Sequence, residues 1–135
     1  MSESIIADKS TCFALNIIKL YKDLIFSRKE YVLSKQILRS GTAIGALVSE
    51  SKFAQSEPDF INKLSIALKE ANETLYWLTL LHKSDFMKTE TFDILQKECN
   101  EIISILVSII KTMKSKQISK KSKPTPNSYL LILIS

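Results

Sequence analysis

The sequence is poor in the residues that interrupt or cross-link a chain. Its 135 residues include only two glycines, three prolines, two cysteines and one histidine. So few glycines and prolines leave little material for turns, and the composition favours long regular elements joined by short links. Cys12 and Cys99 are too few and too far apart for a disulfide framework, which favours a reducing, cytoplasmic location. A single histidine also excludes a His-rich metal cluster.

Long apolar runs and a secretion signal are missing as well. The most apolar stretch of the central chain, residues 102–110, is far shorter than the roughly 20 residues of a membrane-spanning helix. The first ten residues contain Glu3 and Asp8 and have no basic start followed by an apolar segment. With 45% hydrophobic and 24% charged residues, the chain is therefore expected to fold as one domain, neither exported nor inserted in a membrane.

Apolar residues recur at helical spacing in four segments. The clearest start is at Ser56, a good N-cap that is followed by Pro58 and Asp59 in the first turn. Short links between long amphipathic helices predict an all-α, antiparallel up-down-up-down four-helix bundle over residues 1–115. Residues 116–135 are expected to form a flexible tail, Lys-rich at first and then apolar. The expected helices cover about residues 8–27, 30–55, 57–82 and 88–113.

Gly41 and Gly45 lie inside the second expected helix. In a soluble helix each glycine costs about 1 kcal/mol relative to alanine. We therefore expect a compensating close contact there, with a neighbouring helix or an aromatic ring.

The fourth expected helix carries more apolar surface than one bundle core needs. Ile103, Val107 and Ile110 form a second apolar stripe beside the main seam, while Ser104 and Ser108 share one polar face. Such surplus is typical of a subunit contact, so these three residues are the predicted oligomer interface. The alternative is a helix buried centrally in its own bundle.

Candidate catalytic and metal-binding groups are few, and structural roles fit them better. His82 at a helix end is expected to act in capping, and Glu70 and Glu73 lack the Glu-x-x-His partners of bundle di-iron sites. Cys12 and Cys99 lie on or beside apolar stripes and are expected to be small core residues. The sequence therefore predicts no catalytic site, metal or cofactor.

The positive charge is confined to the C-terminal part. The whole chain carries +5, yet residues 1–110 contain 13 Lys and Arg against 14 Asp and Glu, and residues 111–135 contain six Lys and no acid. Such lysines either contact phosphates or complement the dipole of a helix C-terminus. The apolar residues 129–134 that follow are expected to be poorly ordered, with docking on a neighbouring subunit as the alternative. The candidate nucleic-acid contacts are Arg28, Lys29, Lys35, Lys63, Lys111, Lys114, Lys116, Lys120, Lys121 and Lys123.

Two strings in the second and third expected helices carry a family resemblance. They are Gln36-x-x-Arg39-Ser40-x-Thr42-x-Ile44-Gly45-Ala46 with Glu50, and Ser56-x-x-Asp59-Phe60-x-x-Lys63-Leu64-x-Ile66-Ala67-x-Lys69-Glu70-Ala71-x-Glu73-Thr74-x-Tyr76-Trp77-Leu78. Over about residues 8–115 the chain resembles the bacterial four-helix-bundle proteins encoded in intervening sequences of 23S ribosomal RNA genes. The same fold group includes the accessory variability proteins of diversity-generating retroelements.

The resemblance implies assembly into a homopentameric barrel and no known enzymatic activity. For the retroelement relatives it also implies binding to a reverse transcriptase and to nucleic acid through basic surface residues. Where relatives typically have Ser and Asn, this chain has Ala43 and Leu47, which reduces any buried polar network. The remaining candidates for that network are Arg39, Ser40, Glu50, Glu70 and Glu73, and we expect Arg39 to pair with Glu70 or Glu73 because an unpaired buried charge is costly.

These observations predict a non-enzymatic, cytoplasmic, homo-oligomeric scaffold or adaptor that binds RNA or a reverse-transcriptase complex. Two alternatives stay open. One is a purely structural homo-oligomer without a nucleic-acid partner, and the other is a carboxylate-based metal protein or enzyme.

Overall fold

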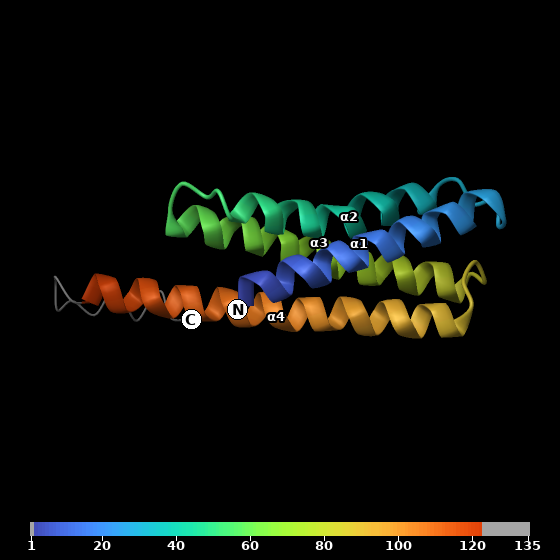
Figure 1. Cartoon of the computed structure of the whole chain (residues 1–135). Coiled ribbons are helices and arrows are strands. Elements are labelled where there is room, and N and C mark those ends of the chain that lie inside the picture. The colour runs from blue at the N-terminus through green and yellow to red at the C-terminus, as the bar shows by residue number, and fades with distance from the viewer. Residues whose placement is uncertain (1, 123–135) are drawn as a thin grey trace.

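A computed structural model describes residues 2–122 of the chain, and the regular structure within that range is entirely helical. Consecutive helices run in opposite directions along a common axis (Figure 1), and α1 also packs against α4. This confirms the predicted all-α class with four helices. Their bounds are α1 (Ser2–Phe26), α2 (Leu33–Ser51), α3 (Glu57–Lys83) and α4 (Thr89–Ser122).

Two helices are longer than expected. α1 begins at Ser2, and α4 continues to Ser122, past the boundary that we expected at residue 115. Lys120 and Lys121 therefore fall within α4. Lys123 and the apolar residues 129–134, with the expected flexible end, lie outside the described residues.

The start of α3 matches the sequence prediction. Ser56 has extended backbone angles, and its side-chain oxygen accepts a hydrogen bond of 3.2 Å from the backbone N–H of Asp59. Pro58 occupies the first turn, where its missing N–H costs no hydrogen bond. The predicted turn between the third and fourth helices is also present, since α3 ends at Lys83 and α4 begins at Thr89.

The start of α2 differs from the prediction because Glu30 precedes the helix and caps it. The Glu30 carboxylate accepts hydrogen bonds from the backbone N–H groups of Val32, Leu33 and Ser34, at 3.1, 2.9 and 2.6 Å. Burial raises the pKa of this carboxyl, but the three backbone donors outweigh burial and the pKa is lowered overall. The helix therefore starts at Leu33 and not at residue 30.

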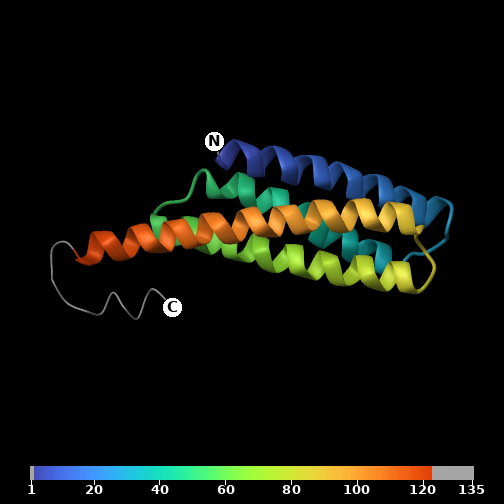
Figure 2. The same cartoon turned by 90° about the horizontal axis from the view of Figure 1, so that it is seen from below.

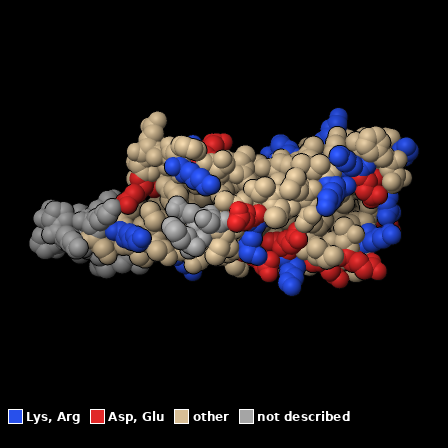
Figure 3. Space-filling view, viewed as in Figure 1, with Lys and Arg blue, Asp and Glu red and all other residues tan. Residues whose placement is uncertain are grey.

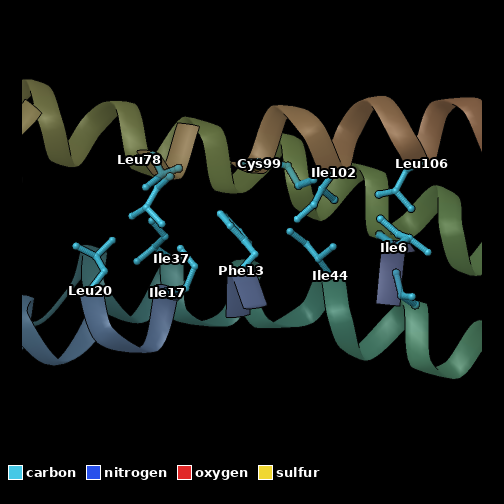
Figure 4. Close-up of a cluster of buried hydrophobic side chains, with 14 of the residues drawn as sticks. Ile6, Phe13, Ile17, Leu20, Ile37, Ile44, Leu78, Cys99, Ile102 and Leu106 are labelled. Carbon is cyan, nitrogen blue, oxygen red and sulfur yellow. Dashed lines mark hydrogen bonds between the residues drawn. The ribbon is translucent and has the colours of Figure 1, made fainter. Parts of the chain in front are cut away.

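One hydrophobic core runs along the bundle. Figure 4 shows side chains of all four helices meeting between the ribbons, with Phe13 and Ile17 from α1 facing Ile102 and Leu78 across the axis. Each of these is almost fully buried. Within residues 2–122, no helix combines the length and the hydropathy needed to cross a bilayer.

The two glycines of α2 lie against α1, as the sequence led us to expect. A Cβ atom on Gly41 would lie 2.9 Å from both Cγ atoms of the buried Ile17, closer than optimal carbon–carbon contact. A Cβ atom on Gly45 would lie 3.4 Å from the carbonyl oxygen of Ser10, which is ordinary contact. Gly41 is therefore the position at which the close approach of α1 requires glycine.

The two ends of the bundle differ. One end holds the α1–α2 and α3–α4 links, where Lys29 and Asp85 adopt positive φ angles of 57° and 67° just after α1 and α3. The other end holds the α2–α3 link and the start of α1. There α4 extends beyond its neighbours (Figures 1 and 2).

Candidate functional site

A polar cluster links the outer edges of α2 and α3. The Arg39 guanidinium forms ion pairs with Glu70, at 3.2 Å from Nη1 to Oε1, and with Glu73 through Nη2. The indole Nε1 of Trp77 donates a hydrogen bond of 3.1 Å to the same Glu73 carboxylate. This confirms the predicted pairing of Arg39, and both carboxylates take part in it.

Helical spacing on α3 explains how the cluster forms. Glu70, Glu73 and Trp77 follow at intervals of three and four residues, which brings them onto neighbouring positions of one helix side. Beneath them, the buried Thr74 hydroxyl donates to the Glu70 carbonyl at 2.8 Å and is hydrogen-bonded to the Ser40 hydroxyl at 2.9 Å. The cluster therefore has an exposed charged layer above a buried layer of two hydroxyl groups.

The charges in the outer layer largely satisfy one another. Desolvation lowers the pKa of the Arg39 guanidinium, but the Coulombic and hydrogen-bonding contacts with Glu70 and Glu73 outweigh it and raise the pKa overall. About half of the Arg39 side chain remains exposed. Glu50, also predicted for this network, is exposed and shares no ion pair or hydrogen bond with the cluster among the described residues. The arrangement ties α2 and α3 together through charges that are paired within it.

The other candidate groups are held in structural contacts. The His82 ring stacks on Phe92, with ring centroids 4.3 Å apart, and its Nε2 lies 3.0 Å from the Thr89 hydroxyl. His82 therefore joins the end of α3 to the start of α4 in place of the predicted capping of carbonyl groups. Among residues 2–122, no three His, Cys, Asp or Glu side chains are grouped so that they could hold a metal ion.

The two cysteines differ from each other. Cys99 is fully buried, its thiol lies 3.3 Å from the carbonyl oxygen of Ala71, and burial raises its pKa to about 12. Its predicted place in the core is confirmed. Cys12 is exposed, so its predicted place in the core is wrong. It lies on the flank of α1, one residue before the buried Phe13.

The candidate nucleic-acid contacts fall into two groups at opposite ends. Arg28 is half-buried and 3.7 Å from Asp23, whereas Lys29 and Lys35 are exposed near the α1–α2 link. On the face in Figure 3, Lys and Arg are interspersed with Asp and Glu around this end. The mixture of signs makes this group a poor phosphate surface.

The second group lies toward the opposite end. Lys63 is paired with Asp59 at 3.8 Å near the start of α3. Lys111, Lys114 and Lys116 are exposed on the last turns of α4. The predicted basic residues therefore do not form one patch. The three lysines of α4 are the group without acidic residues nearby in the sequence.

The predicted oligomer interface on α4 needs one correction. Ile110 is only 8% exposed and belongs to the bundle core, because it follows the buried Leu106 by one helical turn. Ile103 and Val107 are half-buried, so part of their surface remains available.

Two features gave no recognisable signal in the sequence: the capping of α2 by Glu30, and the hydrogen bond from Trp77 to Glu73.

Comparison with known proteins gives a consistent result. Residues 2–108 match the family described as 23S rRNA-intervening sequence protein. Among solved structures, the chain is similar to a protein of unknown function from the S23 ribosomal protein family of Bacteroides thetaiotaomicron VPI-5482. The two chains are 52% identical, the match covers 82% of this chain and 99% of that one, and the TM-score is 0.81. The comparison with curated proteins gives no match.

Proposed function

The chain belongs to the family of 23S rRNA-intervening sequence proteins, and on this premise we propose that it is a non-enzymatic oligomeric scaffold that binds RNA through the basic end of α4. The observation that carries the proposal is the charge distribution along α4. After Glu101 the helix contains no further acidic residue, whereas Lys111, Lys114 and Lys116 are exposed on its last turns. A run of cations without interleaved acids attracts the phosphate backbone.

The position of α4 supports this assignment. The helix extends beyond the start of α1 and α3 (Figure 2), and Lys111, Lys114 and Lys116 on its last turns are exposed. RNA binding of this kind would follow backbone charge, because residues 111–123 contain no aromatic side chain on which bases could stack. The same lysines also complement the dipole at the end of α4, and a stabilising role of that kind needs no RNA.

Titration of a structured RNA hairpin distinguishes these two roles. We would measure binding by fluorescence anisotropy at about 50 mM and about 200 mM salt, which separates phosphate contacts from other contacts. The test variant replaces Lys111, Lys114 and Lys116 by Gln. The matched control replaces the exposed Lys22, Lys69 and Lys97 by Gln, which removes the same charge elsewhere.

The expected result is steep salt dependence for the wild type. The α4 variant should lose at least about tenfold in affinity at the lower salt, and its salt slope should fall by about two to three, since each of its three lost phosphate contacts contributes about 0.7–0.9 to the slope. The control should stay within about twofold of the wild type. Equal losses in both variants, or no binding by the wild type, would contradict the proposal and favour a purely structural oligomer.

We also propose that the scaffold is a homopentamer. Several large apolar side chains are exposed in the described part of the chain, which is typical of a surface that another subunit covers. On α4, Val107 lines a shallow groove of about 400 Å³ together with Leu68 and Ile110. The exposed apolar residues include Leu15, Phe26, Ile66, Tyr76 and Ile94.

Light scattering of the purified protein tests the assembly. A pentamer has about five times the 15.3 kDa mass of the chain. Val107→Glu should lower the mass, because it places a charge on the predicted interface, whereas Ser104→Glu on the exposed side of α4 should not. A monomeric wild type would contradict the proposal, and an unchanged mass for Val107→Glu would place the interface elsewhere. A reverse-transcriptase partner stays a prediction of the resemblance alone.

A further inference from the structure

A groove of about 520 Å³, lined by both polar and apolar side chains, lies at the end of the bundle that holds the α2–α3 link. It lies between that link, the start of α3 and the last turns of α4. Its volume is in the range of about 300–1,000 Å³ that is typical of ligand pockets. The apolar side chains that line it are half-buried, and they are Ala54, Phe60, Ile109 and Met113.

The groove adjoins the described start of the core on α1. Ile6 is the first described core residue of α1, and it lines a small adjoining hollow together with Phe60 and Ile109. Beyond that point, none of the described residues that line the groove belongs to α1. α4 nevertheless continues for several turns in this direction (Figure 2). Among the described residues, the groove therefore extends the bundle core without a wall from α1.

We propose that residues 129–134 of the same chain bind in this groove and supply that wall. The segment reads Tyr-Leu-Leu-Ile-Leu-Ile, without a charged residue, and its composition suits the apolar side chains of the groove, whose lining also carries Lys52, Lys116 and Glu57. The inference goes beyond RNA binding and does not depend on it.

The length of the chain allows this return. Met113 lies nine residues before Ser122, the end of α4, which corresponds to about 14 Å along the helix. Residues 123–128 can span up to about 20 Å when extended. Pro124 and Pro126 are unsuited to a helix interior and favour a change of direction between Ser122 and Tyr129. The apolar segment can therefore lie beside Met113 of its own subunit.

Disulfide trapping in the full-length chain tests the proposal. In a Cys12→Ser background, the test pair is Thr112→Cys with Ile132→Cys, since Thr112 lines the groove. The matched control is Ser115→Cys with Ile132→Cys. Ser115 is exposed on the same part of α4 but lines the groove beside Val107. With diamide as oxidant, the test pair should cross-link at least about fivefold faster than the control, because a disulfide needs Cα atoms within about 7 Å.

Each result has a definite meaning. A cross-link within one chain, formed faster in the test pair, supports the proposal. A faster control pair would place the segment in the groove beside Val107, and a cross-link between two chains would assign the groove to a second copy. Equal slow rates would mean that the segment does not dock. Each of these last three outcomes overturns the proposal.

A second variant separates apolar docking from mere proximity. Leu131→Asp with Leu133→Asp, added to the test pair, should slow cross-linking to the rate of the control, because charged residues resist burial in the groove. These substitutions leave residues 2–122 unchanged, so circular dichroism should show the same helical content as the wild type. Cross-linking that stays fast in this variant would also overturn the proposal.

Discussion

The two flanks of α2 hold their neighbours by opposite means. Toward α1 the helix presents Gly41, whose missing side chain gives room to Ile17. Toward α3 it presents Arg39 and Ser40, which form ion pairs and a hydrogen bond with that helix. Packing against α1 requires that Gly41 has no side chain, whereas packing against α3 requires the polar partners of Arg39 and Ser40.

This difference predicts opposite sensitivities within one helix. On the side that faces α1, a larger residue should destabilise the protein, because the packed interior has no space for added atoms. On the side that faces α3, removal of a hydrogen-bonding or ion-pair partner should destabilise the protein. The loss of stability should be larger in the buried layer than in the exposed layer. Four substitutions test the comparison, in order of decreasing effect.

Gly41→Ala should destabilise the protein by up to about 2 kcal/mol. Overpacking costs about 1–3 kcal/mol, and the better helix propensity of alanine offsets up to about 1 kcal/mol of that cost. Urea unfolding measures the change. Gly45→Ala is the control and should raise stability by up to about 1 kcal/mol, since its Cβ atom finds ordinary contact distance. A Gly41→Ala variant as stable as Gly45→Ala would show that α1 gives way without cost.

Thr74→Val should cost about 1–2 kcal/mol, because it keeps the shape of the side chain and leaves the buried Ser40 hydroxyl without this partner. Thr79→Val is the control, since the half-buried Thr79 hydroxyl bonds only to the Leu75 carbonyl of its own helix. The control should cost less. Adding Ser40→Ala should recover part of the loss in Thr74→Val, and a purely additive double variant would argue against coupling between the two helices.

Glu30→Gln tests the start of α2, which both flanks share, and should cost about 1 kcal/mol at pH 7. Because the folded protein lowers the pKa of Glu30 below its ordinary value of 4.5, the stabilisation is present above that value. It is lost as the pH falls through the folded-state pKa. Unfolding measured from pH 7 to pH 3 should therefore show wild type and variant converging at the acid end. Glu50→Gln, at an exposed position, should show no such convergence.

Arg39→Met should have the smallest effect, below about 1 kcal/mol, because the guanidinium is half-exposed and its ion pairs are screened by water and salt. The difference from the wild type should shrink further at high salt. Trp77 is the only tryptophan and contacts Glu73, so its fluorescence reports the change locally. A loss as large as that of Thr74→Val would mean that the outer layer matters as much as the buried one.

Local signals in the sequence predicted some features well. The Ser56 cap depends on residues within one turn. The need for close packing at Gly41 follows from the cost of glycine in a helix. Both rest on rules that hold wherever the residue lies in the fold. The pairing of Arg39 was instead expected from the family resemblance and from the cost of an unpaired buried charge, whereas the guanidinium that forms the pair is half-exposed.

Other features follow from the conformation of the links, which the helical pattern of the sequence does not specify. Glu30 caps α2 because the link after α1 directs its carboxylate onto three backbone donors two to four residues away. Ile110 is a different case, because its spacing of one helical turn from the buried Leu106 already indicates a place in the core. His82 was expected to cap α3, and its stacking on Phe92 requires the geometry of the α3–α4 link.

The contrast between the two thiols provides a built-in folding probe. In the native state a maleimide dye should modify Cys12 at once and leave Cys99 untouched, because Cys99 is fully enclosed beside Ala71. The second label can then be added only when the centre of the molecule opens. Mass spectrometry of pulse-labelled samples would count one or two adducts per chain, and the rate at which the second appears would time the opening events of the native protein without any engineered reporter.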